Sequence, residues 1–134
     1  MSADVIVTTT PSFRPIVMNS WIAPGVHINA IGADTKGKQE IDQQLFARGK
    51  IVVDSFSQAR ELGETQHAIR DGIIDSVHAE LGEIIAGMKQ GRKNASEITL
   101  FDATGIAIQD LSVAAYVYES AVSKGIGTPI QIDA

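Results

Sequence analysis

One short stretch of the sequence combines a carboxylate, two ammonium groups and two glycines, over residues 32–38. Asp34 can act as a general acid or base, and Lys38 can bind a phosphate or ribose oxygen. Gly32 allows the backbone to approach a ligand closely, and Gly37 permits a tight turn. The same residues are also typical of a solvated polar turn before a helix that begins near Gln39. Spacing alone favours this second interpretation.

Three other polar segments follow apolar runs, at residues 8–12, 54–57 and 102–105. Thr10 lies next to the break at Pro11 and is the strongest candidate in its segment for a functional hydroxyl. Asp102 and Thr104 can line a pocket, although they can equally cap the helix that follows them.

Four apolar runs rich in β-branched residues predict the strands that position these segments. They cover residues 5–9, 26–31, 50–54 and 98–101. The runs are continuous rather than alternating, which is typical of parallel strands covered on both faces. In an open sheet of this kind, ligands bind outside the carboxyl ends of the strands, where the polar segments lie.

Segments with helical periodicity separate the strands. Three of them cover residues 41–49, 77–91 and 111–125. Asp75 or Ser76 can cap the second, and a glycine ends each of the three. A short helix and an irregular connection are expected between residues 57 and 72. The alternation of strands and helices predicts an α/β fold, and 134 residues are enough for a single domain, 1–134.

The composition restricts the kind of protein that this can be. A net charge of −5 argues against a nucleic-acid or membrane-surface partner, because both require a basic surface. The sequence has no cysteine and no His-x-x-x-His pair, so no metal site is expected. It has no secretory signal and no apolar run of roughly 20 residues, so a cytoplasmic protein is expected.

The segment Val-His-Ile-Asn-Ala-Ile-Gly-Ala-Asp-Thr-Lys-Gly-Lys-Gln-Glu, residues 26–40, closely resembles a hallmark of the ornithine cyclodeaminase and mu-crystallin superfamily. Residues 3–12, 50–54, 82–92 and 101–110 agree with the same superfamily in order and spacing. The alanine at position 33 is more similar to the alanine dehydrogenase branch. The resemblance implies part of a Rossmann-type, dinucleotide-binding parallel sheet flanked by helices.

The resemblance also implies hydride transfer between NAD or NADP and a small amino-acid or imino-acid substrate. The resemblance therefore favours a functional loop over a plain polar turn at residues 32–38, since Asp34 matches the residue that handles protons at the amino-acid carbon. Lys38 and Thr10 match contacts to the cofactor. The backbone contacts to the dinucleotide correspond to Ile31, Gly32 and Ala33.

Two matched positions lie near the last predicted strand. Ala103 stands where the family commonly has a serine beside the nicotinamide, so a backbone contact to the cofactor is expected there and a hydroxyl contact is not. Thr104 matches a position near the substrate.

Two features of the complete family members are not found in this sequence. One is a Gly-x-Gly-x-x-Ala turn after the first strand of the nucleotide fold, and the other is an N-terminal substrate and dimerisation region. The chain therefore resembles the C-terminal part of the family's dinucleotide-binding domain. We expect it to form a homo-oligomer or to associate with a complementing N-terminal chain. The alternatives are a catalytically inactive binding or interaction domain and a truncated reading frame without activity.

Overall fold

The structure, a computed structural model, describes residues 3–130. Its central sheet has five strands, all parallel, in the order β1-β3-β7-β5-β6. These are β1 (Val5–Thr8), β3 (His27–Ala30), β7 (Thr99–Asp102), β5 (Lys50–Val53) and β6 (Ala79–Glu80). The four predicted strands are confirmed, and so is the parallel α/β architecture. The short strand β6 was not predicted.

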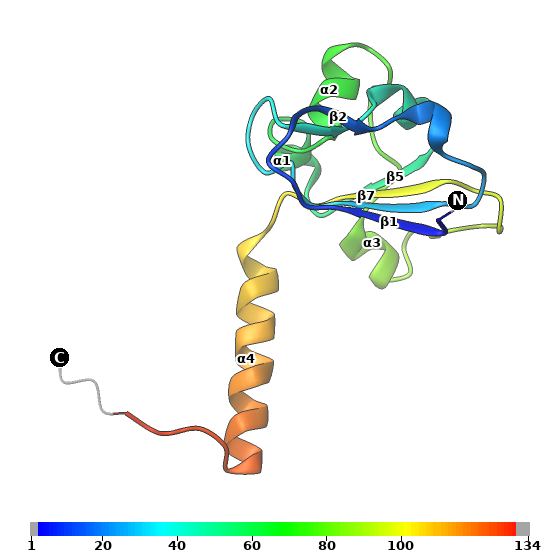
Figure 1. Cartoon of the computed structure of the whole chain (residues 1–134). Coiled ribbons are helices and arrows are strands. Elements are labelled where there is room, and N and C mark those ends of the chain that lie inside the picture. The colour runs from blue at the N-terminus through cyan, green and yellow to red at the C-terminus, as the bar shows by residue number, and fades with distance from the viewer. Residues whose placement is uncertain (1–2, 131–134) are drawn as a thin grey trace.

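The apolar core lies on one face of this sheet. Buried side chains of alternate strand residues form its floor: Ile28, Ala30, Ile51, Val53 and Leu100. Fully burying one isoleucine, valine or leucine side chain stabilises a fold by roughly 1.5–3 kcal/mol. The cover consists of β2 (Phe13–Val17), η1 (Asn19–Trp21), β4 (Gln39–Ile41), η2 (Gln43–Ala47), α1 (Phe56–Ala59) and α2 (Thr65–Arg70). The opposite face carries α3 (Leu81–Ile85) (Figure 1).

The helix predicted over residues 41–49 is wrong. Residues 39–41 form β4 instead, which pairs with β2, and only the 3-10 helix η2 follows. The backbone of β4 is held from outside the segment, because the Glu64 carboxylate accepts hydrogen bonds from the amides of Glu40 and Ile41. These long-range bonds replace the local i to i+4 bonds of a helix.

The helix predicted over residues 77–91 is shorter than expected. Ala79 and Glu80 pair with Val52 and Val53 as strand β6, and the helix covers only Leu81–Ile85. Neither Asp75 nor Ser76 caps it: Glu80 does so, in a reciprocal capping box with Glu83. Because these two residues pair with β5, the first turn of the predicted helix forms a strand instead. The region between residues 57 and 72 contains two short helices, α1 and α2.

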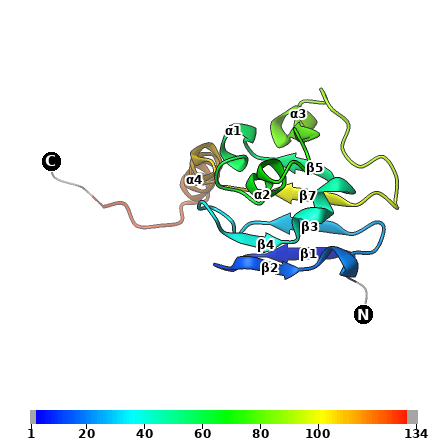
Figure 2. The same ribbon diagram turned by 90° about the horizontal axis from the view of Figure 1, so that it is seen from above.

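The last predicted helix is confirmed as α4 (Ala107–Lys124), and it ends at Gly125 in a left-handed conformation, φ 62°. Neither Asp102 nor Thr104 caps α4, since Ile106 occupies that position. The helix leaves the carboxyl edge of the sheet and projects away from it, and none of its residues is buried (Figures 1 and 2). Among residues 3–130, no helix is both long and apolar enough to cross a membrane.

Candidate active site at the carboxyl edge of the sheet

The ends of β1 and β3 bring two predicted site segments together. These strands are neighbours in parallel register, with Thr8 opposite Ala30, and the amide of Ile31 donates to the carbonyl of Thr8 at 2.9 Å. The segments containing Thr10 and Gly32 therefore run side by side. A Cβ on Gly32 would lie only 2.5 Å from the Thr10 carbonyl oxygen, so this approach requires glycine.

Asp34 and Lys38 form an ion pair at this edge. The Lys38 Nζ lies 2.7 Å from Asp34 Oδ1, with side chains 19% and 57% exposed respectively. The hydrogen bond from Lys38 lowers the pKa of Asp34 below its usual value, and one from the Thr35 hydroxyl acts in the same direction. Asp34 is therefore an accessible anion at neutral pH, the state that a general base requires.

Helix α2 holds the loop that carries this pair. The Gly37 amide donates to Gln66 Oε1 at 2.8 Å, and Gly37 has the positive φ of 87° that favours glycine. His67 Nε2 lies 2.7 Å from the Lys38 carbonyl oxygen. A carbonyl can only accept, so Nε2 carries the proton. No pattern in the chain predicts that residues 66 and 67 support residues 37 and 38.

Three buried carboxylates behind the site accept hydrogen bonds from backbone amides of separate segments and so hold these segments together. Glu40 accepts from the amides of Thr10 and Gly32, and Glu64 accepts from the amides of Glu40 and Ile41. Asp102 accepts from the Glu64 and Thr65 amides and from the Thr65 hydroxyl. Burial raises the pKa of Glu64 to about 8 and that of Asp102 to about 6.

Sequence reasoning missed the role of Glu40 and Glu64. Glu40 closes the motif at residues 26–40, which was a signal, but nothing in the spacing indicates that its side chain is fully buried. Asp102 was predicted as a pocket or capping residue, and its carboxylate is turned into the protein instead.

Ala103 and Thr104 both lie at the carboxyl edge, and both are buried. The Ala103 amide donates to the carbonyl of Ala30 at 3.0 Å, which places this strand exit beside residues 31–38. The Thr104 hydroxyl donates to Asp54 Oδ1 at 3.0 Å, and the Thr104 amide donates to Asp54 Oδ2 at 2.8 Å. Thr104 thus already has an internal partner for its side chain.

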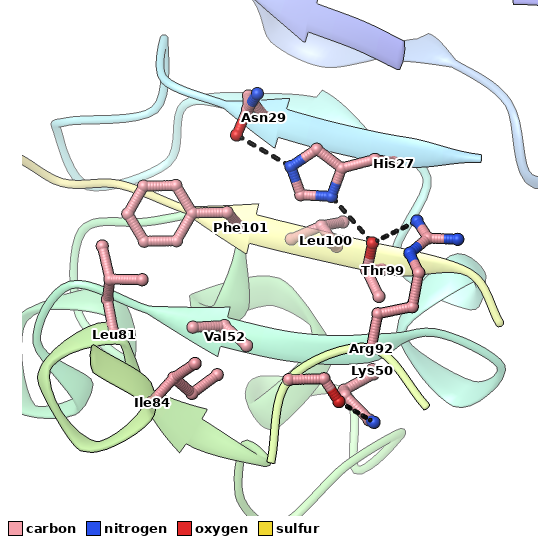
Figure 3. Close-up of a pocket in the computed structure, with 11 residues that line it drawn as sticks. His27, Asn29, Lys50, Val52, Leu81, Ile84, Arg92, Thr99, Leu100 and Phe101 are labelled. Carbon is pink, nitrogen blue, oxygen red and sulfur yellow. Dashed lines mark hydrogen bonds between the residues drawn. The ribbon is translucent and has the colours of Figure 1, made fainter. Parts of the chain in front are cut away.

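A separate cavity of about 380 Å³ lies on the opposite face of the sheet, between α3 and strands β3, β5 and β7 (Figure 3). Most of its polar side chains bond to one another: His27 lies 2.7 Å from the Thr99 hydroxyl and 3.1 Å from Asn29 Oδ1. Arg92 donates to the same hydroxyl at 2.7 Å. His27 and Asn29 are thus bonded internally, and the cavity contains none of the predicted site residues.

A wholly parallel sheet with polar loops gathered at its carboxyl edge defines the class of open α/β proteins that bind ligands at that edge. Within this class, the chain belongs to the ornithine cyclodeaminase/mu-crystallin family, whose model matches residues 1–125. The resemblance inferred from the motifs is confirmed.

Comparison with individual proteins gives the same result. Alanine dehydrogenase of Archaeoglobus fulgidus is 53% identical over 130 residues, which cover 96% of this chain and 40% of that protein. A solved archaeal alanine dehydrogenase dimer with bound NAD has a TM-score of 0.86 at 52% identity, over 97% of this chain and 41% of that one. Delta(1)-pyrroline-2-carboxylate reductase of Thermococcus litoralis, solved with NADH and L-proline, has a TM-score of 0.87 at 37% identity. The match covers 96% of this chain and 41% of that one.

This chain thus spans only about 40% of the length of the curated relatives that it matches. The fold and the family are shared over nearly all of the chain. The matching segment contains the carboxyl edge of the sheet, with Asp34 and Lys38.

Proposed function

We propose that this chain supplies the nicotinamide side of the active site of an NAD(P)-dependent amino-acid oxidoreductase or cyclodeaminase, of the alanine dehydrogenase type. The observation that carries the proposal is the accessible Asp34–Lys38 pair at the adjoining exits of β1 and β3. Relatives with this fold are solved with NAD or NADH.

The groups at this edge suit the nicotinamide end of a dinucleotide. Lys38 Nζ bonds only to Asp34 within the described residues, and an ammonium group has three donors, so donors remain for a ribose or amide oxygen. The backbone of Ile31, Gly32, Ala33 and Ala103 and the side chain of Thr10 complete the proposed contacts. When bound, the cofactor accepts or returns the hydride of the amino-acid carbon.

Asp34 is the proposed acid and base. As the amino acid is oxidised, hydride leaves its α-carbon and a proton leaves its nitrogen, which gives an imino acid. Asp34, anionic in the resting site, takes up a proton and returns it in the reverse direction. Lys38 must loosen its bond to Asp34 as that proton arrives. Thr104 is proposed near the substrate, through its backbone carbonyl, since Asp54 accepts hydrogen bonds from both its hydroxyl and its amide.

The proposed partners are a small amino-acid or imino-acid substrate and a second polypeptide. That polypeptide is another copy of this chain or a chain that supplies the regions found in the longer relatives. One relative is solved as a dimer. A binding or interaction domain without catalysis remains the alternative function, and a chimeric enzyme separates the two.

The chimera tests the proposal directly. Residues 3–130 replace the matching segment of the Archaeoglobus fulgidus alanine dehydrogenase, which shares 53% identity with this chain. We expect the chimera to oxidise NADH in the presence of pyruvate and ammonia. A chimera that folds and binds NADH without turning over any amino-acid or imino-acid pair would favour the non-catalytic alternative.

A further inference from the structure

Glu40 is a buried carboxylate whose two oxygens hold two different loops of the proposed site. Oε1 accepts from the amide of Thr10 at 2.5 Å, and Oε2 accepts from the amide of Gly32 at 3.0 Å. Thr10 follows β1 and Gly32 follows β3, so a single side chain connects the two strand exits. Glu40 itself is fully buried and lies too deep to touch a ligand.

The surroundings of Glu40 fix its position. Its own amide donates to Glu64 Oε1 at 2.6 Å, and the amide of Glu64 donates to Asp102 Oδ1 at 3.1 Å. On the side of the loops there is no spare room, because a Cβ on Gly32 would lie 2.4 Å from Glu40 Oε2. The carboxylate therefore cannot shift without moving both loops.

We infer that Glu40 is a positioning residue for the cofactor, acting through the backbones of Thr10 and Gly32. The inference rests on the proposed function for the identity of the ligand. A carboxylate offers an acceptor to each of the two amides, whereas a glutamine in its place offers one oxygen and turns an NH₂ group toward the second N–H. Glu40→Gln must therefore release one of the two loops.

The test uses the ¹⁵N-labelled 134-residue chain and reduced nicotinamide mononucleotide, which represents the half of the cofactor assigned to this edge. In E40Q we expect amide hydrogen exchange at Thr10 or Gly32 to become about tenfold faster, the effect of losing one hydrogen bond. We also expect several-fold weaker binding of the mononucleotide, with the exchange of the β5 and β7 amides unchanged. Glu61→Gln is the matched control, because that carboxylate is 65% exposed and lies outside the site.

Unchanged exchange and unchanged mononucleotide binding in a folded E40Q variant would overturn the inference. If E40Q does not fold, Glu40→Asp replaces it: it keeps the charge but is too short to reach both amides, so the same two losses are expected. In the unmodified chain labelled with both ¹⁵N and ¹³C, scalar couplings across the hydrogen bonds must be detectable from the Thr10 and Gly32 nitrogens to the Glu40 carboxyl carbon, and their absence would contradict the arrangement.

Different results would contradict the proposed cofactor binding and the inference about Glu40. If the unmodified chain shows no response to the mononucleotide and the folded chimera does not bind NADH, the cofactor proposal is contradicted. Exchange at Thr10 and Gly32 in E40Q then still decides whether Glu40 holds the loops. If the mononucleotide binds equally well to both proteins while exchange increases, Glu40 is structural and does not position the cofactor.

Discussion

Asp34 differs from the other carboxylates at the carboxyl edge in being exposed. Asp54, Glu40, Glu64 and Asp102 are buried and accept hydrogen bonds from the backbone of other segments, whereas Asp34 accepts from the side chains of Thr35 and Lys38 in its own loop. This exposure is the reason why Asp34 is the carboxylate that we propose exchanges a proton with a bound molecule.

Replacing Asp34 by asparagine in the chimera should abolish turnover while leaving NADH binding largely intact. The amide has the same size but cannot exchange a proton, and general acid–base catalysis contributes about 10²–10⁴-fold. Steady-state rates and an NADH titration measure the two effects. Asp75→Asn, at an exposed position away from the edge, is the control. Turnover close to that of the unmodified chimera would remove Asp34 from the catalytic role.

Glu64 predicts how stability depends on pH. Burial raises its pKa from the usual 4.5 to about 8, so the folded state retains a proton that the unfolded chain has released. The stabilisation is complete below pH 4.5 and is lost as the pH rises through 8. The free energy of unfolding should fall over this range, by at most about 1.4 kcal/mol per pH unit for this one group. The raised pKa of Asp102 lowers the free energy of unfolding in the same way, but only up to about pH 6, where the folded state also loses that proton.

Urea unfolding at a series of pH values between about 6 and 8 isolates the contribution of Glu64. The Glu64→Gln variant should lose the decline in that window, while Glu61→Gln should retain it. A decline of equal slope in all three proteins would assign it to other groups.

At the scale of elements, β1 is an edge strand with one neighbour, β3, among the described residues. Val5 and Val7 are 57% and 59% exposed, and the strand contains neither lysine nor proline to discourage pairing. Unpaired backbone donors and acceptors on such an edge favour association with another strand.

We therefore expect the chain to self-associate through β1, with a sedimentation coefficient that increases with concentration. Val7→Lys should reduce the association, because a lysine on an edge strand opposes pairing. Ser20→Lys adds the same charge at η1 and should leave the association unchanged. A monodisperse monomer at high concentration would contradict this prediction.

At the scale of the whole molecule, the 134-residue chain has the residues assigned to the nicotinamide but no glycine fingerprint for the pyrophosphate. That group is bound at a helix N-terminus behind a glycine-rich turn. Gly125 and Gly127 do not supply it, since they follow helix α4 rather than a strand.

The chain alone should therefore bind NADH weakly, with a dissociation constant of roughly 1 mM or above. Isothermal titration calorimetry with NADH measures this, and the chimera, which regains the remaining parts of the fold, serves as the comparison. Tight, saturable binding by the chain alone would show that residues other than a glycine-rich turn hold the pyrophosphate.

The sequence by itself determined the strands β1, β3, β5 and β7, their parallel arrangement and the last helix. Continuous β-branched runs such as residues 50–54 are typical of parallel strands, and the stripe of α4 depends on local spacing alone. The motif at residues 26–40 was sufficient to identify the family and to single out Asp34 and Lys38. Each of these properties is encoded within a few consecutive residues.

Only the tertiary structure decided the form of residues 39–41 and 79–80, which became strands where helices were predicted. Their backbone bonds go to Glu64, β2 and β5, far away in the sequence, and these bonds outweigh the weak local preference for a helix. The same is true of Glu40: its residue type is visible in the sequence, but the two loops that it joins meet only because β1 and β3 are neighbours. The hydrogen bond from the Thr10 amide to Glu40 joins residues 30 positions apart, so no periodic pattern in the sequence indicates it.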